Sequence, residues 1–237
     1  MAAEHIIKSY DEELARLNNM IVEMGGLAES QLAAAIDAVA KRDSVLATRV
    51  VEGDAQVDAI ERELDNLAIR LLALRQPMAR DLREIFAALK IGSDHERICD
   101  YAANVAKRSI ALAQIPPIQP VYALPRMGQL ALALVKDVID AYVEKDADKA
   151  LEVWRRDEEL DEMYSSLFRE FLTYMMEDPR NIGGCTHLLF MAKNIERIGD
   201  HATNIAEAIY YIVTGEQLPA GRPKEDKSPG VTLAPKG

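Results

Sequence analysis

Apolar residues recur at three- and four-residue steps through most of the chain, and this spacing is typical of amphipathic helices. The steps predict six long helices, with breaks at Pro77 and at Asp178-Pro179, since proline cannot continue a helix interior. Asp43 is placed to cap the second helix. Gly25-Gly26 is expected to interrupt or bend the first. The predicted helices cover residues 11–41, 45–75, 79–112, 126–144, 149–177 and 181–213.

The second three predicted helices repeat the plan of the first three. Residues 196–206 (ERIGDHATNIA) are a near copy of residues 96–106 (ERICDYAANVA), with seven of eleven positions identical. The break before the second helix recurs 103 residues later at Lys145-Asp146. The sequence therefore predicts an all-α fold of two similar three-helix bundles that arose by internal duplication.

The segment 115–125 has four prolines in eleven residues and reads as a semi-rigid linker. It divides the chain into a first bundle over residues 1–114 and a second over residues 126–214. Residues 215–237 are rich in proline, glycine and lysine and are expected to form a disordered tail.

Composition narrows the class of protein. Apolar residues make up 49% of the chain and aromatic residues only 5%, which suits helix-on-helix packing around an aliphatic core. The net charge of −11 argues against nucleic-acid binding, which needs clustered basic residues, and favours cations or a basic partner. Two isolated cysteines and the lack of a secretory signal or an apolar run of about 18 residues predict a cytoplasmic protein.

The repeated stretch places oxygen-bearing side chains four residues apart, on one face of a helix. Because two copies retain the same polar residues, a polar function is indicated. The preceding helix of each bundle offers more carboxylates, and several oxygen ligands together suit a hard cation such as Mg, Ca, Mn or Fe. The candidate metal ligands are Glu96, Asp100, Glu196, Asp200, Asp58 and Asp161, joined by Asn104, Asn204, Asp54 and Asp157.

Other readings of the same residues are open. The acidic stripes could be solvated faces or contacts for a basic partner, and a carboxylate-bridged metal enzyme is a third possibility. No Glu-x-x-His pair, nucleophile elbow or phosphate-binding loop supports catalysis. His95 and His201 are interpreted as packing or surface residues. Arg97 and Arg197 are expected to pair with carboxylates across helix interfaces. The basic run 75–83 has no counterpart in the second half.

The paired ERI(C/G)DxAxN motifs, together with Met24-Gly25-Gly26, the 75–83 run and residues 172–178, resemble the PhoU family of phosphate-specific transport accessory proteins. The resemblance implies two three-helix bundles, a homodimer, and metal clusters on Glu96, Asp100, Glu196 and Asp200, with iron, zinc, manganese or magnesium as the metal. Cys99 stands where the family has glycine, and close packing and metal binding are expected to persist.

The resemblance also implies a function. Members are cytoplasmic negative regulators of phosphate uptake and of the phosphate-starvation response. They are thought to connect the ATPase subunit of the phosphate ABC transporter to a membrane sensor histidine kinase, so they meet the membrane only through these partners. A non-catalytic, metal-binding adaptor is therefore expected. The alternative is a metal-free helical scaffold whose acidic faces bind a basic partner surface.

Overall fold

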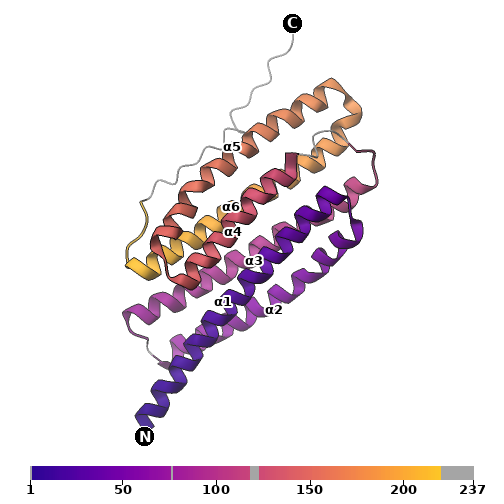
Figure 1. Cartoon of the computed structure of the whole chain (residues 1–237). Coiled ribbons are helices and arrows are strands. Elements are labelled where there is room, and N and C mark those ends of the chain that lie inside the picture. Colours follow the sequence, from indigo (N-terminus) through magenta and orange to yellow (C-terminus); the bar gives the residue numbers. More distant parts are fainter. Residues whose placement is uncertain (1, 76, 118–122, 220–237) are drawn as a thin grey trace.

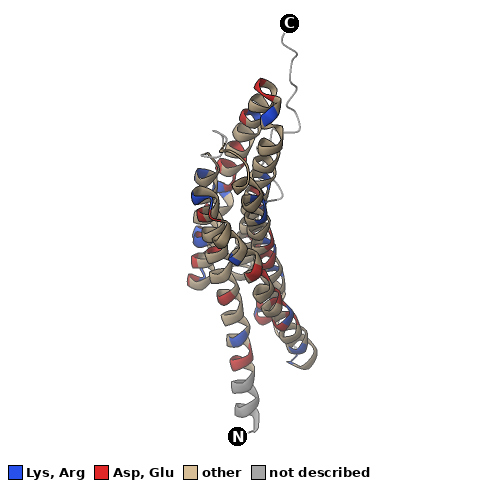
Figure 2. Ribbon diagram, turned by 90° about the vertical axis from the view of Figure 1, so that its right-hand side faces the viewer, with Lys and Arg blue, Asp and Glu red and all other residues tan. Residues whose placement is uncertain are grey.

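The computed structural model describes residues 2–75, 77–117 and 123–219, and within these ranges the chain is helical with no strand. The six long helices of these ranges run side by side in an elongated body, which is thinner when viewed from the side (Figures 1 and 2). Lysine and arginine are interspersed with aspartate and glutamate along these helices (Figure 2). The all-α fold predicted from the sequence is confirmed.

The first half consists of α1 (Ala2–Lys41), α2 (Ser44–Arg75) and α3 (Ala79–Ala113). Helix α1 starts earlier than the apolar pattern predicted and continues through Gly25 and Gly26 without interruption. A Cβ atom on Gly25 would lie 3.0 Å from Ile139 Cγ1 on α4. The glycine thus permits close helix packing and does not break α1.

The second half consists of α4 (Leu124–Glu144), α5 (Ala147–Glu177), a short 3₁₀ helix η2 (Pro179–Asn181) and α6 (Ile182–Thr214). Helix α4 includes Pro125 in its first turn, where a proline lacks no needed hydrogen bond. Part of the predicted linker (118–122) and most of the predicted tail (220–237) lie outside the described residues.

The corners between the first and second helices of each half have the same conformation. Arg42 and Lys145 both adopt the left-handed region, each with φ of 53°. Asp43 then accepts hydrogen bonds from the backbone nitrogens of Val45 and Leu46, both at 3.0 Å, and Asp146 caps α5 in the same way. The predicted cap at Asp43 is confirmed, and the duplication extends to the backbone of the corner.

The two halves pack side by side and share one hydrophobic core. Helix α1 lies against α4, and α3 lies against α6 (Figure 1). Helices α3 and α6 are antiparallel, since Arg83 near the start of α3 lies by Tyr211 near the end of α6. At the opposite ends of the two helices Arg108 covers Phe190. The two repeated motifs are consequently neighbours at the middle of the molecule.

None of the described helices is long and apolar enough to cross a membrane.

Candidate functional site

The first acidic stripe lies on α3, where Glu96 and Asp100 are both half-buried. Arg97 Nε lies 3.4 Å from Glu96 Oε2, and Arg97 Nη1 lies 3.5 Å from Asp100 Oδ2. Burial and then the Asp100 charge raise the pKa of Glu96. The carboxylates are therefore close enough to repel each other and are only partly neutralised by one arginine.

Helix α2 adds carboxylates to the same site. Burial, followed by the charges of Asp100 and Asp58, raises the pKa of Asp54. The pKa of Glu61 is raised by burial, followed by the charges of Asp65 and Asp58. The two predicted α2 residues, Asp54 and Asp58, thus face the α3 stripe.

Glu61 was not among the predicted site residues. It lies near enough to Glu96 for its charge to raise the pKa of Glu96. Its spacing could have revealed it, because Asp54, Asp58 and Glu61 follow one another at four and three residues, on one face of α2.

The second acidic stripe is more deeply buried. Glu196 on α6 is 4% exposed, and Lys193 Nζ donates a hydrogen bond of 2.8 Å to its Oε1. Burial outweighs this lysine and raises the pKa of Glu196 to about 7, with the charges of Asp200 and Asp161 acting in the same direction. The other oxygen, Oε2, is buried without a hydrogen-bond partner.

Helix α5 supplies two buried carboxylates to this stripe, Asp157 and Asp161, which are 1% and 2% exposed. The helices approach closely because Gly199 has no side chain. A Cβ there would overlap Leu160 Cδ2 and lie 3.0 Å from Asp157 Oδ1. The glycine of the second motif thus sets how deeply the Asp157 carboxylate is buried.

Cys99 occupies the position of Gly199 in the first copy, and its thiol is fully buried. Burial and then the charge of Asp54 raise the pKa of this thiol, so the sulfur lies close to that carboxylate. Asp54, the counterpart of Asp157, is only half-buried. The two acidic sites therefore differ in depth. The Cys99 side chain occupies the space beside α3 in the first site, whereas Gly199 leaves that space to residues of α5 in the second.

Polar contacts join the two motifs across the interface between α3 and α6. His201 Nδ1 lies 2.7 Å from Asp94 Oδ1, and the Asn204 amide donates to the same oxygen at 3.3 Å. The ring of Tyr101 lies between His201, at 5.6 Å, and the Arg197 guanidinium, also at 5.6 Å. The predicted ligand Asn204 thus has a structural contact, whereas Asn104 is half-buried at the end of its own stripe.

The prediction for His95 is confirmed, whereas the contacts of Arg97 and Arg197 differ in part from those expected. His95 is 2% exposed in the core, and burial lowers its pKa to about 4, so it is a neutral packing residue. Arg97 pairs with carboxylates of its own helix, and Arg197 covers an aromatic ring. The expected pairing across a helix interface is present for Arg97 as a charge interaction, since the Arg97 charge opposes the burial that raises the pKa of Glu61 on α2. Arg197 instead lies over the ring of Tyr101 on α3.

The donor set fits a hard cation. A positive ion would stabilise carboxylates that raise one another's pKa, and it would satisfy the Glu196 Oε2, which is buried without a hydrogen bond. As they stand, no three His, Cys, Asp or Glu side chains of the described ranges are grouped closely enough to hold a metal. The side chains are of the type that binds a hard cation, but their present positions do not form a complete set of metal ligands.

Fold and site together define a class: an all-α protein of two tandem three-helix units, each carrying an acidic motif in its third helix. The sequence pattern of the PhoU domain matches residues 21–109 and again residues 124–209. The chain belongs to the PhoU family. The double match confirms the internal duplication predicted from the repeated stretch.

Named relatives span almost the whole chain. The phosphate-specific transport system accessory protein PhoU homolog of Caulobacter vibrioides is 54% identical over 94% of this chain and 97% of its own length. The homolog of Xylella fastidiosa (strain 9a5c) is 53% identical over 97% of each. The crystal structure of PhoU from Pseudomonas aeruginosa superposes with a TM-score of 0.85 at 39% identity, covering 87% of this chain and all of that one.

Proposed function

We propose that this protein is a non-catalytic regulator of phosphate transport that restrains phosphate uptake and the phosphate-starvation response. Membership of the PhoU family supports this, as does the name of its relatives, which are accessory proteins of the phosphate-specific transport system. The carboxylates and amides of its two motifs suit binding of a cation, and the Cys99 thiol is fully buried with a raised pKa, which makes it a poor nucleophile.

The regulator binds metal ions on its two acidic stripes. Glu96, Asp100, Asp54 and Asp58 would hold one group of ions, and Glu196, Asp200, Asp157 and Asp161 the other. The observation that carries this proposal is the buried Glu196 Oε2, an oxygen without a hydrogen bond on a carboxyl whose pKa is raised to about 7. A hard cation would stabilise the ionised carboxylates by charge neutralisation, with water completing its shell.

The metal-loaded faces act as docking surfaces in the cytoplasm. The partners are the ATPase subunit of the phosphate ABC transporter and the membrane sensor histidine kinase, which the protein connects, and the active form is a homodimer. A dense group of carboxylates carrying multivalent cations can bridge to acidic partner groups that the bare protein, with a net charge of −11, would repel.

Metal content tests the proposal. The protein is purified without a histidine tag and its metals are measured by mass spectrometry, in the parent and in the double variant Asp100→Ala/Asp200→Ala. Iron, zinc, manganese or magnesium is expected in the parent and lost from the variant. Co-purification with the ATPase subunit or the kinase is measured in parallel and should weaken together with the metal.

A second function has one structural observation in its favour. Arg97 and Lys193 already lie beside the carboxylates of their stripes, so basic groups alone can neutralise part of the charge. A metal-free scaffold would use the acidic faces to bind a basic partner surface. A parent without metal that retains both partners would establish this alternative and exclude the metal-dependent adaptor.

A further inference from the structure

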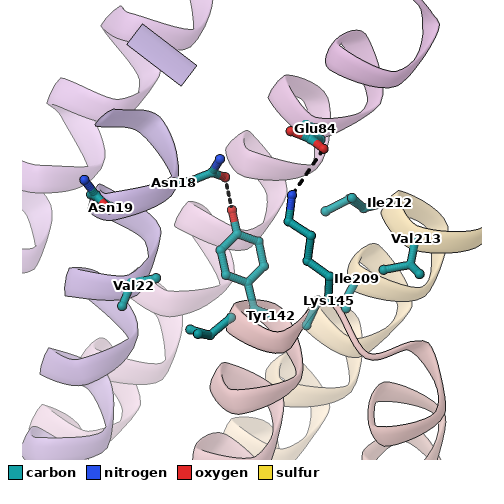
Figure 3. A pocket seen from close by; sticks show the side chains of 10 residues that line it. Asn18, Asn19, Val22, Glu84, Tyr142, Lys145, Ile209, Ile212 and Val213 are labelled. Carbon is teal, nitrogen blue, oxygen red and sulfur yellow. Dashed lines mark hydrogen bonds and ion pairs between the residues drawn. The ribbon is translucent and has the colours of Figure 1, made fainter. Parts of the chain in front are cut away.

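Two adjoining pockets lie where α1, α3, α4 and α6 meet, at the end of the molecule that holds the start of α3 and the end of α6. One, of about 180 Å³, lies between Asn18 on α1, Tyr142 on α4 and the apolar end of α6 (Figure 3). The other, of about 220 Å³, is lined by Arg80 and Arg83. Both share Lys145, Ile212 and Val213, so together they have the size of a small-molecule site.

The second pocket carries an excess of positive charge. Glu84 Oε1 lies 3.4 Å from Arg80 Nε and 3.6 Å from Lys145 Nζ, so one carboxylate serves two cations. The Arg83 guanidinium lies 6.0 Å from the centre of the Tyr211 ring, and no carboxylate of the described residues pairs with it. Its Nε is buried without a hydrogen bond. Three cations thus face one acid in a chain whose net charge is −11.

The first pocket is mainly apolar, with walls that include Val22, Ile209 and Ile212. Asn18, Asn19 and Tyr142 supply its uncharged polar groups, and the Tyr142 hydroxyl donates a hydrogen bond of 2.5 Å to Asn18 Oδ1. Its charged groups, Glu84 and Lys145, form the ion pair that the second pocket shares. Burial raises the pKa of Tyr142, so its hydroxyl stays uncharged at neutral pH. Such a pocket accepts an uncharged organic body with few polar groups.

The duplicated half does not reproduce this set of residues, although Arg180 stands in the place of Arg80. Gly183 and Gly184 stand 100 residues after Arg83 and Glu84, the offset that relates the two motifs. Arg42, the corner counterpart of Lys145, donates to the carbonyl oxygens of Leu112 and Ile115 and so has a structural contact. The basic pocket is a feature of one end of the molecule only.

We propose that the two pockets together bind a small phosphate monoester, with the phosphoryl group among Arg80, Arg83 and Lys145 and an uncharged, largely apolar body beside Tyr142. Three cations and one carboxylate leave an excess of two positive charges, which matches the charge of a phosphate monoester near neutral pH. Guanidinium groups bind phosphoryl oxygens in a planar, bidentate manner. Inorganic phosphate would leave the apolar pocket unfilled.

The ligand class is tested by isothermal titration of the full chain at constant ionic strength with phenyl phosphate, inorganic phosphate and benzoate. Phenyl phosphate is expected to bind more tightly than either other probe, since it alone supplies both a dianion and an apolar ring. Equal binding of inorganic phosphate, or of benzoate, overturns the proposal, as does the absence of phenyl phosphate binding at millimolar concentration.

The site is tested with Arg83→Gln, which removes one cation from the pocket, and with Lys90→Gln, which removes an exposed cation elsewhere on α3. Arg83→Gln is expected to weaken phenyl phosphate binding about tenfold or more, through loss of charge-assisted hydrogen bonds. Lys90→Gln should leave it nearly unchanged. Glu84→Gln should tighten binding several-fold because it removes the one acid, and this gain cannot come from unfolding. Equal affinities across the three variants overturn the assignment.

Discussion

Asp94 on α3 and His201 on α6 join the two duplicated halves, with Oδ1 and Nδ1 2.7 Å apart. The two residues come from separate copies of the repeated unit, and neither has a counterpart of its own kind in the other copy, where Asn194 and Tyr101 stand. The contact therefore belongs to the assembled pair of bundles and is not repeated by the internal symmetry. It fixes the register in which the two motif helices pack.

Asp94→Ala should lower the free energy of unfolding by about 1–3 kcal/mol, because His201 and Asn204 both lose their partner in a partly buried interface. Urea denaturation monitored by circular dichroism measures this. Asp37→Ala is the control, since its ion pair with Lys41 is solvent-exposed and contributes little to stability. Equal losses in both variants would show that the interface contact has no special weight.

Gly199→Ala should destabilise the protein by about 1–3 kcal/mol through overpacking, because the added Cβ overlaps Leu160 Cδ2 and approaches Asp157 Oδ1. Gly183→Ala on the same helix is the matched control. A Cβ there meets nothing within 4 Å, and alanine favours helix by about 0.5–1 kcal/mol. The two alanine variants should therefore shift the thermal midpoint in opposite directions, and a stabilised Gly199→Ala would contradict the close approach of α5 and α6.

Glu196 should make stability depend on pH in metal-free buffer. Its folded pKa of about 7 lies above the ordinary value of 4.5, so the folded state binds the proton more tightly than the unfolded state. Below about pH 4.5 the group is protonated in both states. As pH rises toward 7, the unfolded chain ionises first and the contribution, about 2–3 kcal/mol, is progressively lost.

Glu196→Gln removes this titration. With metals chelated, the variant should gain stability relative to the parent between pH 4.5 and 7 and hold that gain above pH 7, as measured by urea denaturation across the range. Glu96→Gln serves as the comparison, since Glu96 is half-buried and its effect should be smaller. A parent and a Glu196→Gln variant with parallel pH profiles would show that burial does not control this carboxyl.

Asp43→Ala and Asp146→Ala should each lower stability by about 1 kcal/mol, through loss of the side-chain cap at the start of α2 and of α5. Because the two corners share backbone conformation and cap geometry, the losses should be similar and should add in the double variant. Thermal unfolding measures both. A much larger loss at one corner would show that the duplicated corners have different supports.

The periodicity of apolar residues was sufficient to predict the helices, because burying one face is a local requirement that repeats every three to four residues. The copy at residues 96–106 and 196–206 was sufficient to predict the duplication, and the cap at Asp43 followed from side-chain chemistry within three residues. Spacing also placed Asp54 in the same cluster as Asp100, since both positions face outward from the core of one bundle.

Contacts between segments that are far apart in the sequence cannot be predicted from such local patterns. Nothing along the sequence relates Gly25 to Ile139, so the pair of glycines predicts an interruption or a bend where the structure has a close helix crossing. The burial of Asp157 depends on the absence of a side chain at Gly199, on another helix. The repeat does not mark Glu61, because Tyr164 stands 103 residues later, and only its spacing from Asp58 on α2 indicates that it belongs to the site.

The corner at Arg42 and its repeat at Lys145 share one left-handed backbone conformation, yet their side chains meet different neighbours. An ancestral gene that doubled itself would have inherited this bend in two places. With one arginine still tying the first bend to the end of α3, selection could alter the chemistry of the other without loosening the scaffold. A duplicated corner of this kind allows one copy to gain a ligand-binding side chain while the other copy keeps its structural contact.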